Sequence, residues 1–519
     1  MIQGPSIFAL VQPRSARMNW ALVVLLTVVA FLIRCYNLSI DPVWIDEAAT
    51  LQIASLSVGD LLGEMARIES SPSGFYLLAK GWIGLFGTEI GNVRLLPAIA
   101  GALAVVPIWI FARNAFNERT AWLSASLLAL AASHVRLSQD ARTYTVLFLV
   151  FCFAMVVALR LIRIPSVDRH SISLIIALGV LQGILGWLHA TSVVLIFALG
   201  VFVVAGTAVG PMGFRRGVAV VVACGLVTLL VAALPFASAL RHLVQPEFAD
   251  RWIARPSVLE TLAVYGRTLV APFLYWLSPV AGVIAAALLL LAVIVGLLHR
   301  SAPTIALAAM LIAAGIAMPL LSNVAPVLLD RTILFLWAPV YLLISAGAAA
   351  IPGRAFHLAG ISLLLLQGVG LVNYYRLEIR KEQWPAAAAL VAVQAGQLQP
   401  IVVTEGAFAA LALSIPLKAL GEASPRIIVV PPTSELERFV AKHSMYEVVT
   451  RPSDLCPVIA GASAVWVVSR ALPASVKGDE GFTSRAGVVG ALRAASSTLV
   501  SHESVAGVDV ERWTPPRCL

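Results

Sequence analysis

Residues 18–50 read MNWALVVLLTVVAFLIRCYNLSIDPVWIDEAAT, an apolar run followed almost at once by two adjacent carboxylates, Asp46 and Glu47. The apolar part predicts a membrane-spanning helix, and Trp44 stands where that helix would surface. A carboxylate at this boundary stays wet enough to ionise yet lies close to the lipid, which suits a general base acting on a lipid-borne substrate. Alternatively, the acidic pair begins a short helix and stabilises its positive end.

The composition is that of a polytopic membrane protein. Of 519 residues, 60% are hydrophobic and 12% are charged, and the mean hydropathy is +0.92, whereas soluble domains carry roughly 25% charged residues. A net charge of +9 and a pI near 9.6 are also typical of nucleic-acid-binding proteins. We exclude a nucleic-acid partner because the arginines fall in short loops between apolar runs, where they report membrane orientation.

The apolar runs predict about eleven membrane-spanning helices, each of roughly 20 residues. These runs cover residues 19–36, 95–113, 119–135, 143–163, 171–188, 191–209, 217–238, 279–298, 303–321, 331–350 and 356–375.

Basic residues occupy alternate gaps between these runs, which predicts a cytoplasmic N-terminus. No convincing cleavage site follows the first run, so we expect an uncleaved first helix. An odd number of spans then places residues 376–519 outside the cytoplasm. The basic groups are Arg14 and Arg17; Arg113 and Arg119; Arg160, Arg163 and Arg169; Arg215 and Arg216; His299 and Arg300; and Arg354.

The sequence divides into a membrane domain, residues 1–375, and a small α/β domain, residues 376–519. The membrane domain has two long outer loops, 37–94 and 239–278. In the tail, short β-branched runs alternate with helical patterns, which predicts a parallel sheet. The predicted strands are Ile401–Thr404, Arg426–Val430 and Ala464–Ser469. No glycine-rich nucleotide fingerprint follows any of these strands.

A second acidic residue, Glu69, lies in the first outer loop. Pro72 and Gly74 predict a bend after it that can aim its side chain back at the first helix. Alone, Glu69 would be a solvated loop charge, and it becomes a candidate because the same loop carries Asp46.

Residues 133–144, SHVRLSQDARTY, form a short and densely charged outer turn. Arg136 and Arg142 are candidates to bind phosphate, because a guanidinium group matches phosphate oxygens in a two-pronged manner. Asp140 can orient an arginine, bind a divalent cation or assist the base. A purely structural network between Asp140 and Arg142 is an equal alternative.

Two further candidates lie at outer positions. Arg331, which follows Asp330 at the mouth of the tenth run, fits a lipid phosphate or serves as an anchor at the membrane surface. His189 lies beside Trp187 in the tight turn between the fifth and sixth runs. There, a satisfied interfacial histidine is favoured over a catalytic one.

The five cysteines show no metal-ligand spacing. Cys152 and Cys224 lie in apolar runs and are expected to pack there. Cys456 and Cys518 would form a disulfide if the tail faces an oxidising compartment, although spacing alone does not fix the pairing.

The chain resembles the dolichyl-phosphate-mannose protein mannosyltransferase-like superfamily of bacterial membrane glycosyltransferases, because several of its motifs occur in the same order along the sequence. That superfamily has the C-type glycosyltransferase fold, and the aminoarabinose transferases acting on lipid A are relatives. The resemblance extends from the first apolar run through Ala387. It rests on Trp44–Glu47, Ser71–Leu78 with Phe86-Gly87, Arg94–Pro97, Ser138–Tyr144, Trp187–His189, Asp330-Arg331 and Glu382–Ala387.

The resemblance implies transfer of a hexosyl or pentosyl group, with inversion, from a polyprenyl-phosphate donor to a lipid, glycan or protein acceptor. The reaction would take place at the outer face of the bacterial inner membrane. Asp46 would match the catalytic aspartate, with Glu47 in support and Glu69 as a second functional carboxylate. Arg142 and Arg331 would match residues near the donor phosphate.

One departure concerns the first loop. Many relatives carry His or Lys before a Pro-Pro pair, whereas this chain reads Ser-Ser-Pro-Ser at residues 70–73. That difference weakens the expectation of a metal or phosphate contact there. A divalent cation stays open, because the carboxylates can hold one while no ligand set is spaced to require it.

Two other classes of function predict different sequence features. A transporter or flippase of lipid-linked glycans would carry charges in mid-helix and show repeat symmetry. Here the charges lie in outer loops and no repeat is visible. A non-catalytic envelope assembly protein would tolerate the substitution Asp46→Asn.

Overall fold

The structure is a computed structural model. It describes residues 15–63, 73–166, 168–244, 256–265, 290–291, 293–298, 300–324, 327–376, 381–394, 399–404, 406–420, 426–430, 444, 446–471 and 483–518.

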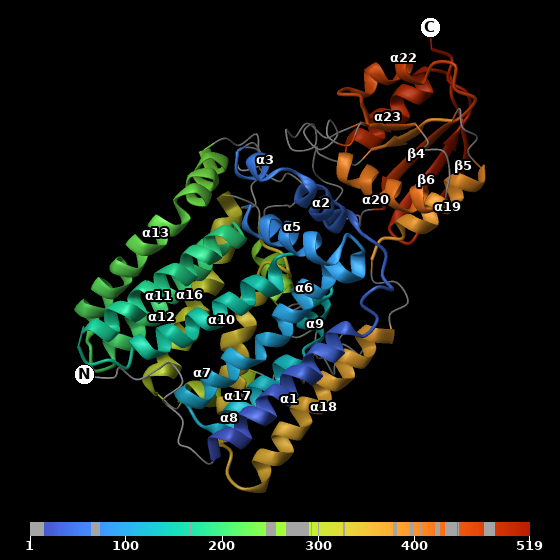
Figure 1. The fold of residues 1–519 in the computed structure, drawn as a ribbon. Coiled ribbons are helices and arrows are strands. Elements are labelled where there is room, and N and C mark those ends of the chain that lie inside the picture. Colours follow the sequence, from blue (N-terminus) through green and yellow to red (C-terminus); the bar gives the residue numbers. More distant parts are fainter. Residues whose placement is uncertain are drawn as a thin grey trace.

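The membrane part is a bundle of apolar helices (Figure 1). Within the described residues, six helices are long and apolar enough to cross a membrane. These six are Ile90–Ala115, Tyr144–Leu161, Arg169–Leu188, Phe214–Leu240, Ala302–Val324 and Arg354–Arg376. Shorter apolar helices match further predicted spans, including Ser192–Ala208 and Leu334–Ala350. The predicted span 279–298 lies largely outside the described residues, so the predicted count of about eleven stays a prediction.

In chain order the bundle contains α1 (Ser15–Cys35), α6 (Ile90–Leu103), α7 (Val105–Ala115), α8 (Glu118–Leu130), α9 (Ala132–Ser138), α10 (Tyr144–Leu161), α11 (Arg169–Leu188), α12 (Ser192–Ala208), α13 (Phe214–Val244), α16 (Ala302–Val324), η2 (Leu334–Leu336), α17 (Trp337–Ala350) and α18 (Arg354–Arg376). Two runs predicted as single spans are each built from two helices, α6 with α7 and α8 with α9.

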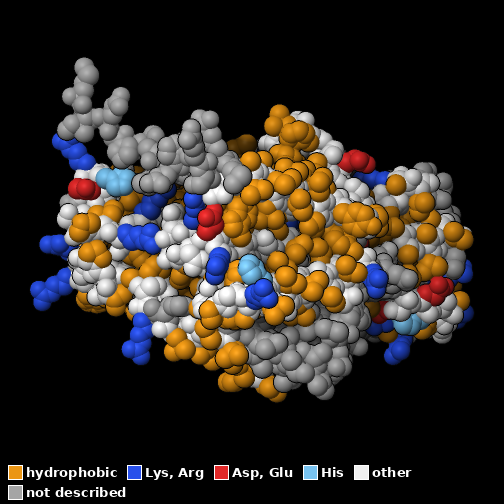
Figure 2. All heavy atoms as spheres, turned by 90° about the horizontal axis from the view of Figure 1, so that it is seen from below, with side chains coloured by type: hydrophobic (Ala, Val, Ile, Leu, Met, Phe, Trp, Pro, Cys, Tyr) orange, Lys and Arg blue, Asp and Glu red, His pale blue; other side chains and the backbone are white. Residues whose placement is uncertain are grey.

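Large apolar side chains remain exposed along α1, α13, α16 and α18. Leu230 in α13, for example, is 83% exposed. Figure 2 shows broad hydrophobic surface over the helices, with most of the visible Lys and Arg side chains toward one end. Such a surface is unfavourable in water but suits helices that face lipid.

In its described residues, the first outer loop forms three short helices at the end of the bundle nearest the C-terminal region (Figure 1). They are α2 (Ile45–Ser55), α3 (Val58–Leu62) and α5 (Gly74–Phe86). Gly74 lies so close to the chain that an added Cβ would stand 2.4 Å from the carbonyl oxygen of Trp187. This contact requires glycine and packs the start of α5 against the turn that carries His189.

The C-terminal region contains a six-stranded sheet of order β3-β2-β1-β4-β6-β5. Its strands are β1 (Ile401–Val403), β2 (Ile427–Val429), β3 (Glu447–Val448), β4 (Val465–Arg470), β5 (Leu499–Val505) and β6 (Val508–Trp513). The predicted strands correspond to β1, β2 and β4, which pair in parallel. The prediction of a purely parallel sheet is wrong, because β6 pairs antiparallel with both β4 and β5. Polar residues interrupt β5 and β6, so neither shows the continuous apolar run of a buried strand.

Successive residues of the central strands face two different cores. Val402 and Val467 pack with helices α22 (Leu455–Ile459) and α23 (Thr483–Ala494). Val403 and its neighbours pack with α19 (Trp384–Gln394) and α20 (Gly406–Ala419), and this core is continuous with that of the bundle. Helix α20 packs against α2. The C-terminal region is therefore docked on the loop that carries Asp46.

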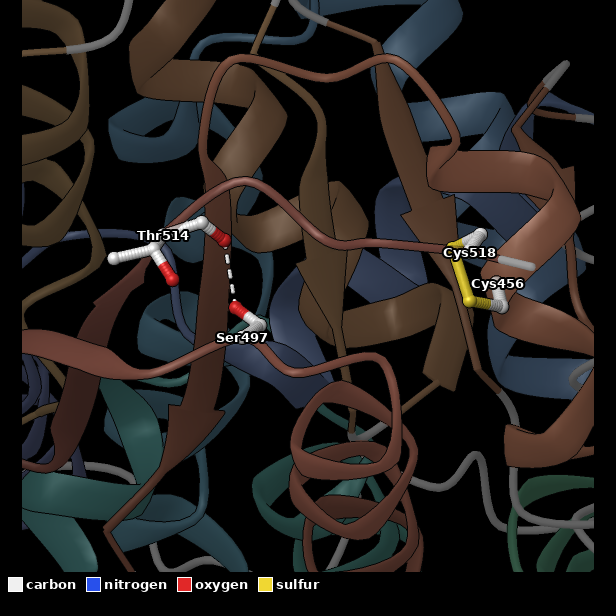
Figure 3. The surroundings of a disulfide bond; sticks show 4 residues. All are labelled: Cys456, Ser497, Thr514 and Cys518. Atoms are coloured by element: carbon white, nitrogen blue, oxygen red, sulfur yellow. Dashed lines mark hydrogen bonds between the residues drawn. A yellow bond between two sulfur atoms is a disulfide. The ribbon is translucent and has the colours of Figure 1, made fainter.

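A disulfide joins Cys456 in α22 to Cys518, and their Cα atoms lie 5.4 Å apart (Figure 3). Beside it, the Ser497 hydroxyl donates a hydrogen bond to the carbonyl oxygen of Thr514 at 2.6 Å. The pairing that the sequence left open is confirmed.

Candidate active site

The first turn of α2 carries Asp46 and Glu47 on different faces, because consecutive residues of a helix project about 100° apart. The Asp46 side chain is 24% exposed, whereas the Glu47 side chain is fully buried. Two adjacent carboxylates therefore have different environments.

Glu47 is held by an arginine from the start of α6. Arg94 donates from Nε to Oε1 at 2.8 Å and from Nη2 to Oε2 at 2.6 Å. The backbone N–H of Ala141 donates to Oε1 at 2.9 Å. Arg94 also donates to the carbonyl oxygens of Leu38, Asp41 and Pro42. Arg94 thus ties α2 to the chain before it, and Glu47 ties α2 to the turn after α9.

A lysine from the start of the C-terminal region completes this arrangement. Lys381 Nζ lies 3.1 Å from Oε1 of Glu47 and 2.8 Å from Oδ1 of Asp140. We call Glu47, Arg94, Asp140 and Lys381 the rear cluster. Burial alone would raise the pKa of Glu47, but Lys381 and Arg94 outweigh it and hold this pKa at about 2. Glu47 is thus a buried anchor, charged at neutral pH, that supports Asp46 from behind and has no exposed face for a substrate.

The Asp46 carboxylate pairs with Arg331, and a second arginine, Arg142, binds the backbone of the same residue. Arg331 Nη1 lies 3.4 Å from Oδ2 of Asp46, and its guanidinium carbon lies 5.7 Å from the ring centroid of Trp44. Arg142 Nη1 donates to the Asp46 carbonyl oxygen at 3.2 Å and to Thr50 Oγ1 at 3.3 Å. We call Trp44, Asp46, Arg142 and Arg331 the front cluster. It brings together the carboxylate and two of the three arginines singled out in the sequence.

Two buried polar atoms of the front cluster make no hydrogen bond among the described residues. Within the described residues, neither Oδ2 of Asp46 nor Nε1 of Trp44 has a hydrogen-bond partner, although Oδ2 lies 3.4 Å from Nη1 of Arg331 in an ion pair. Because buried polar atoms are almost always paired, this acceptor and this donor are suited to contact a bound molecule.

His189 ends α11 beside the front cluster. Its Nδ1 accepts a hydrogen bond from the backbone N–H of Thr191 at 3.1 Å and lies 2.8 Å from the Thr191 hydroxyl. Burial, together with the charges of Arg142 and Arg331, lowers the pKa of His189 to about 3. His189 is therefore neutral at pH 7, with its proton on Nε2. This agrees with the satisfied interfacial histidine favoured from the sequence.

Arg136 binds a carboxylate instead of pointing at Asp46. Its Nη2 lies 2.6 Å from Oδ2 of Asp330, and both side chains are close to half exposed. Asp330 also accepts a hydrogen bond from the backbone N–H of Arg331 at 2.8 Å. Arg136 thus reaches the front cluster only through Asp330 and Arg331.

Several side chains of residues 138–144 are held by specific hydrogen bonds. Gln139 Nε2 donates to the carbonyl oxygens of Arg34 and Tyr36, and its Oε1 accepts from the Tyr374 hydroxyl at 2.7 Å. The Ser138 hydroxyl accepts from Nε of buried Arg34 at 3.2 Å. The side-chain network between Asp140 and Arg142 is not formed, because the Asp140 carboxylate pairs with Lys381. The turn thus connects the bundle to both clusters.

The roles of Arg94 and Lys381 as partners of Glu47 were not predicted from the sequence. An arginine at the outer end of an apolar run contradicts the expected placement of basic residues inside, and that contradiction signals a buried acidic partner. Lys381 lies in a charged segment and carries no such signal. The candidate Glu69 lies outside the described residues.

The contacts of Asp46 among the described residues do not make up a site for a divalent cation. Such ions take several oxygen ligands, whereas the charged group paired with this carboxylate is the guanidinium of Arg331. Across the described ranges, no group of three or more His, Cys, Asp or Glu side chains gathers in one place.

Known proteins provide a comparison. Residues 70–236 match the family described as dolichyl-phosphate-mannose-protein mannosyltransferase. A search of the curated proteins gave no match.

Solved structures show the same fold. ArnT from Cupriavidus metallidurans in the apo state superposes with a TM-score of 0.63 at 14% identity, over 95% of this chain and 98% of that chain. The same ArnT bound to undecaprenyl phosphate gives 0.58 at 13% identity, over 96% and 98%.

The archaeal oligosaccharyltransferase AglB from Archaeoglobus fulgidus, in complex with an inhibitory peptide and a dolichol-phosphate, gives a TM-score of 0.52 at 12% identity. That match covers 87% of this chain and 70% of that chain. At these identities the likeness establishes the fold alone. Together with the family match over residues 70–236, it supports the resemblance drawn from the motifs: the chain is similar to the dolichyl-phosphate-mannose-protein mannosyltransferase family over those residues and shares the fold of ArnT.

Proposed function

We propose that this protein is an inverting glycosyltransferase. It moves a sugar from a polyprenyl-phosphate donor to a lipid, glycan or protein acceptor at the outer face of the bacterial inner membrane. The front cluster carries the proposal, because the partly exposed carboxylate of Asp46 pairs with Arg331 at the end of a membrane bundle, and Arg142 is held beside it by the backbone carbonyl oxygen of the same residue. The lipid phosphates bound to ArnT and AglB support this class of donor.

The proposed chemistry uses each member of the front cluster. Asp46 removes the proton from the acceptor hydroxyl as that oxygen attacks the anomeric carbon of the sugar. The bond from this carbon to the phosphate oxygen breaks, and its electron pair stays on the departing polyprenyl phosphate. Arg142 and Arg331 stabilise the negative charge that develops on the phosphate. Attack opposite to the leaving group inverts the configuration.

Glu47 and Lys381 keep the front cluster in place and do not contact the substrate in this scheme. Fixed groups are effective because a misplacement of about 1 Å can cost roughly 100-fold in rate. The bonds of Glu47 to Arg94 and Ala141 hold α2 and the turn that carries Arg142 together.

Two observations support an extracytoplasmic C-terminal region. Disulfides persist in oxidising compartments, and Cys456 pairs with Cys518 in the tail. The alternating basic loops place the same region outside when the N-terminus is cytoplasmic. We therefore propose a multi-pass protein of the inner membrane with its front cluster on the outer side.

The test measures release of free polyprenyl phosphate from a panel of polyprenyl-phosphate sugars, with membrane extract supplying the acceptor. Wild type should release it from at least one donor, and Asp46→Asn should be slower by about 100-fold to 10,000-fold. Asp60→Asn is the matched control, because Asp60 lies in the same outer loop and accepts a local hydrogen bond from Ser57.

Loss of release in Asp46→Asn, with Asp60→Asn unchanged and both variants folded, would support the base at Asp46. Equal release by wild type and Asp46→Asn would move the base to another carboxylate. If wild type releases nothing from any donor, the transporter and assembly interpretations gain support.

A further inference from the structure

The segment that leads from α18 into the C-terminal region makes contacts in two directions. Toward the bundle, Lys381 pairs with Glu47 and Asp140 of the rear cluster. Toward the sheet, Glu382 pairs with Arg470 of β4 and accepts a hydrogen bond from Trp384 Nε1 at 2.8 Å. The next residue, Gln383, donates from its backbone to the carbonyl oxygen of Ala506 at 3.1 Å. The adjacent side chains of Lys381 and Glu382 therefore bind the helix bundle and the C-terminal sheet, respectively.

The rear cluster is balanced in charge only when Lys381 is present. Glu47 and Asp140 contribute two negative charges, and Arg94 and Lys381 contribute two positive charges. The Lys381 side chain is 10% exposed, and Asp140 is 8% exposed in the same pair. Within the described residues Lys381 is the group that forms an ion pair with Asp140. Removing the lysine would leave a buried carboxylate without that partner, which is strongly unfavourable.

Lys381 also acts on the geometry of the front cluster through the turn that contains Asp140. Its Nζ lies 3.4 Å from the carbonyl oxygen of Gln139, in addition to its contact with Asp140. Two residues after Asp140, Arg142 donates to the backbone of Asp46. The lysine thus clamps this turn against α2, and the turn sets the distance between Arg142 and Asp46.

We infer that Lys381 is a positioning residue, through which the C-terminal region holds the front cluster in its working geometry. This inference rests on the proposed glycosyl transfer. It gives the C-terminal region a role in the reaction although that region supplies no member of the front cluster.

The test uses the full-length protein and a donor that wild type turns over. Four variants are compared with wild type: Lys381→Met, Lys381→Arg, the double variant Lys381→Met with Asp140→Asn, and Lys418→Met. Lys418 is an exposed lysine of α20 in the same C-terminal region and is the matched control. For each protein, kcat and KM for polyprenyl phosphate release and the unfolding midpoint in detergent are measured.

Lys381→Met should lower kcat by roughly 10-fold to 100-fold, in line with the cost of misplacing a reacting group. Its KM for the donor should stay within about threefold, because Asp46 and Asp330 still hold Arg331. Lys381→Arg should retain kcat within about threefold, because it keeps the charge. Lys418→Met should match wild type.

The double variant separates positioning from stability. It restores the charge balance of the rear cluster, so its unfolding midpoint should return toward that of wild type. Its kcat should stay low, because the turn is no longer tied to residue 381. If Lys381→Met does not fold, the double variant alone decides the question by the same two measurements.

A kcat that recovers together with the unfolding midpoint would show a merely structural role and overturn the inference. Unchanged kcat in Lys381→Met would also overturn it, while wild-type turnover would leave the proposed function standing. Absence of release by wild type from every donor would instead reject the proposed function, and the inference with it.

Discussion

The front and rear clusters hold neighbouring carboxylates of one helix turn in different environments. Asp46 is partly exposed, and its charged neighbour Arg331 lies 3.4 Å away. Glu47 is fully buried and receives hydrogen bonds from Arg94, Ala141 and Lys381. Asp46 and Glu47 are both carboxylates and are adjacent in the sequence, so their different environments arise from the residues that surround each of them.

Under the proposed function, the difference explains how one acid stays reactive beside one that is inert. A carboxylate that accepts several charge-assisted hydrogen bonds has a low pKa and is a poor base. The same bonds make it a strong anchor, because an unpaired buried charge is costly. A partly exposed carboxylate that makes a single, longer ion pair, as Asp46 does with Arg331, can still take a proton from a substrate.

The largest effect is expected from breaking the rear cluster. Arg94→Met should lower the free energy of unfolding by about 3–5 kcal/mol, because Glu47 loses its bidentate partner in a buried site. Chemical unfolding in detergent measures this loss. Arg136→Met is the matched control, since it breaks a pair of the same 2.6 Å length that is close to half exposed.

Exposed pairs contribute about 0–1 kcal/mol, so Arg136→Met should change stability little. Similar losses in the two variants would contradict the distinction between a buried and an exposed pair. A second check is the double variant Arg94→Met with Glu47→Gln, which should be more stable than Arg94→Met alone.

A smaller effect, on activity alone, is expected in the front cluster. Arg331→Met should lower kcat/KM for the donor by roughly 10-fold to 100-fold, because one charge-assisted contact to phosphate contributes about 1.5–3 kcal/mol. The unfolding midpoint should stay near that of wild type. Kinetics of polyprenyl phosphate release measure the first quantity, and a loss of stability as large as in Arg94→Met would contradict the assignment.

The smallest effect is expected on the pH dependence of stability. Glu47 has a pKa of about 2, below its ordinary value of 4.5, so its stabilising contribution is present above pH 4.5 and is lost as the pH falls toward 2. His189 has a pKa of about 3, below its ordinary value of 6.5. Its neutral form is favoured in the fold, and this contribution is lost as the pH falls from 6.5 toward 3.

Unfolding midpoints between pH 8 and pH 3 test both signs. His189→Asn should flatten the decline that begins near pH 6.5, and Glu47→Gln should flatten the decline below pH 4.5. A wild-type protein whose midpoint rises as the pH falls through this range would contradict both assignments.

Much of the architecture could be predicted from local patterns. Apolar runs located the helices of the bundle, and β-branched runs located β1, β2 and β4. The antiparallel strands β5 and β6 could not be found in this way, because their pairing partners, and not their own composition, make them strands. The division of two predicted spans into helix pairs, α6 with α7 and α8 with α9, could not be predicted from the length of the apolar runs either.

The front cluster was within reach of the sequence because its members share one side of the membrane. Hydropathy and the placement of basic residues are properties of each segment by itself, and together they sort the loops into two faces. Asp46, Arg142 and Arg331 fall on the same face by this argument, and the structure brings them together.

By itself, therefore, the sequence determined a membrane bundle with one polar end and placed the acidic pair at that end. Only the tertiary structure decided which of the two acids is buried. The deciding partners, Arg94 and Lys381, lie 47 and 334 residues after Glu47 in the chain. Burial and pairing depend on contacts made across such separations, and the residues beside a carboxylate in the sequence do not reveal them.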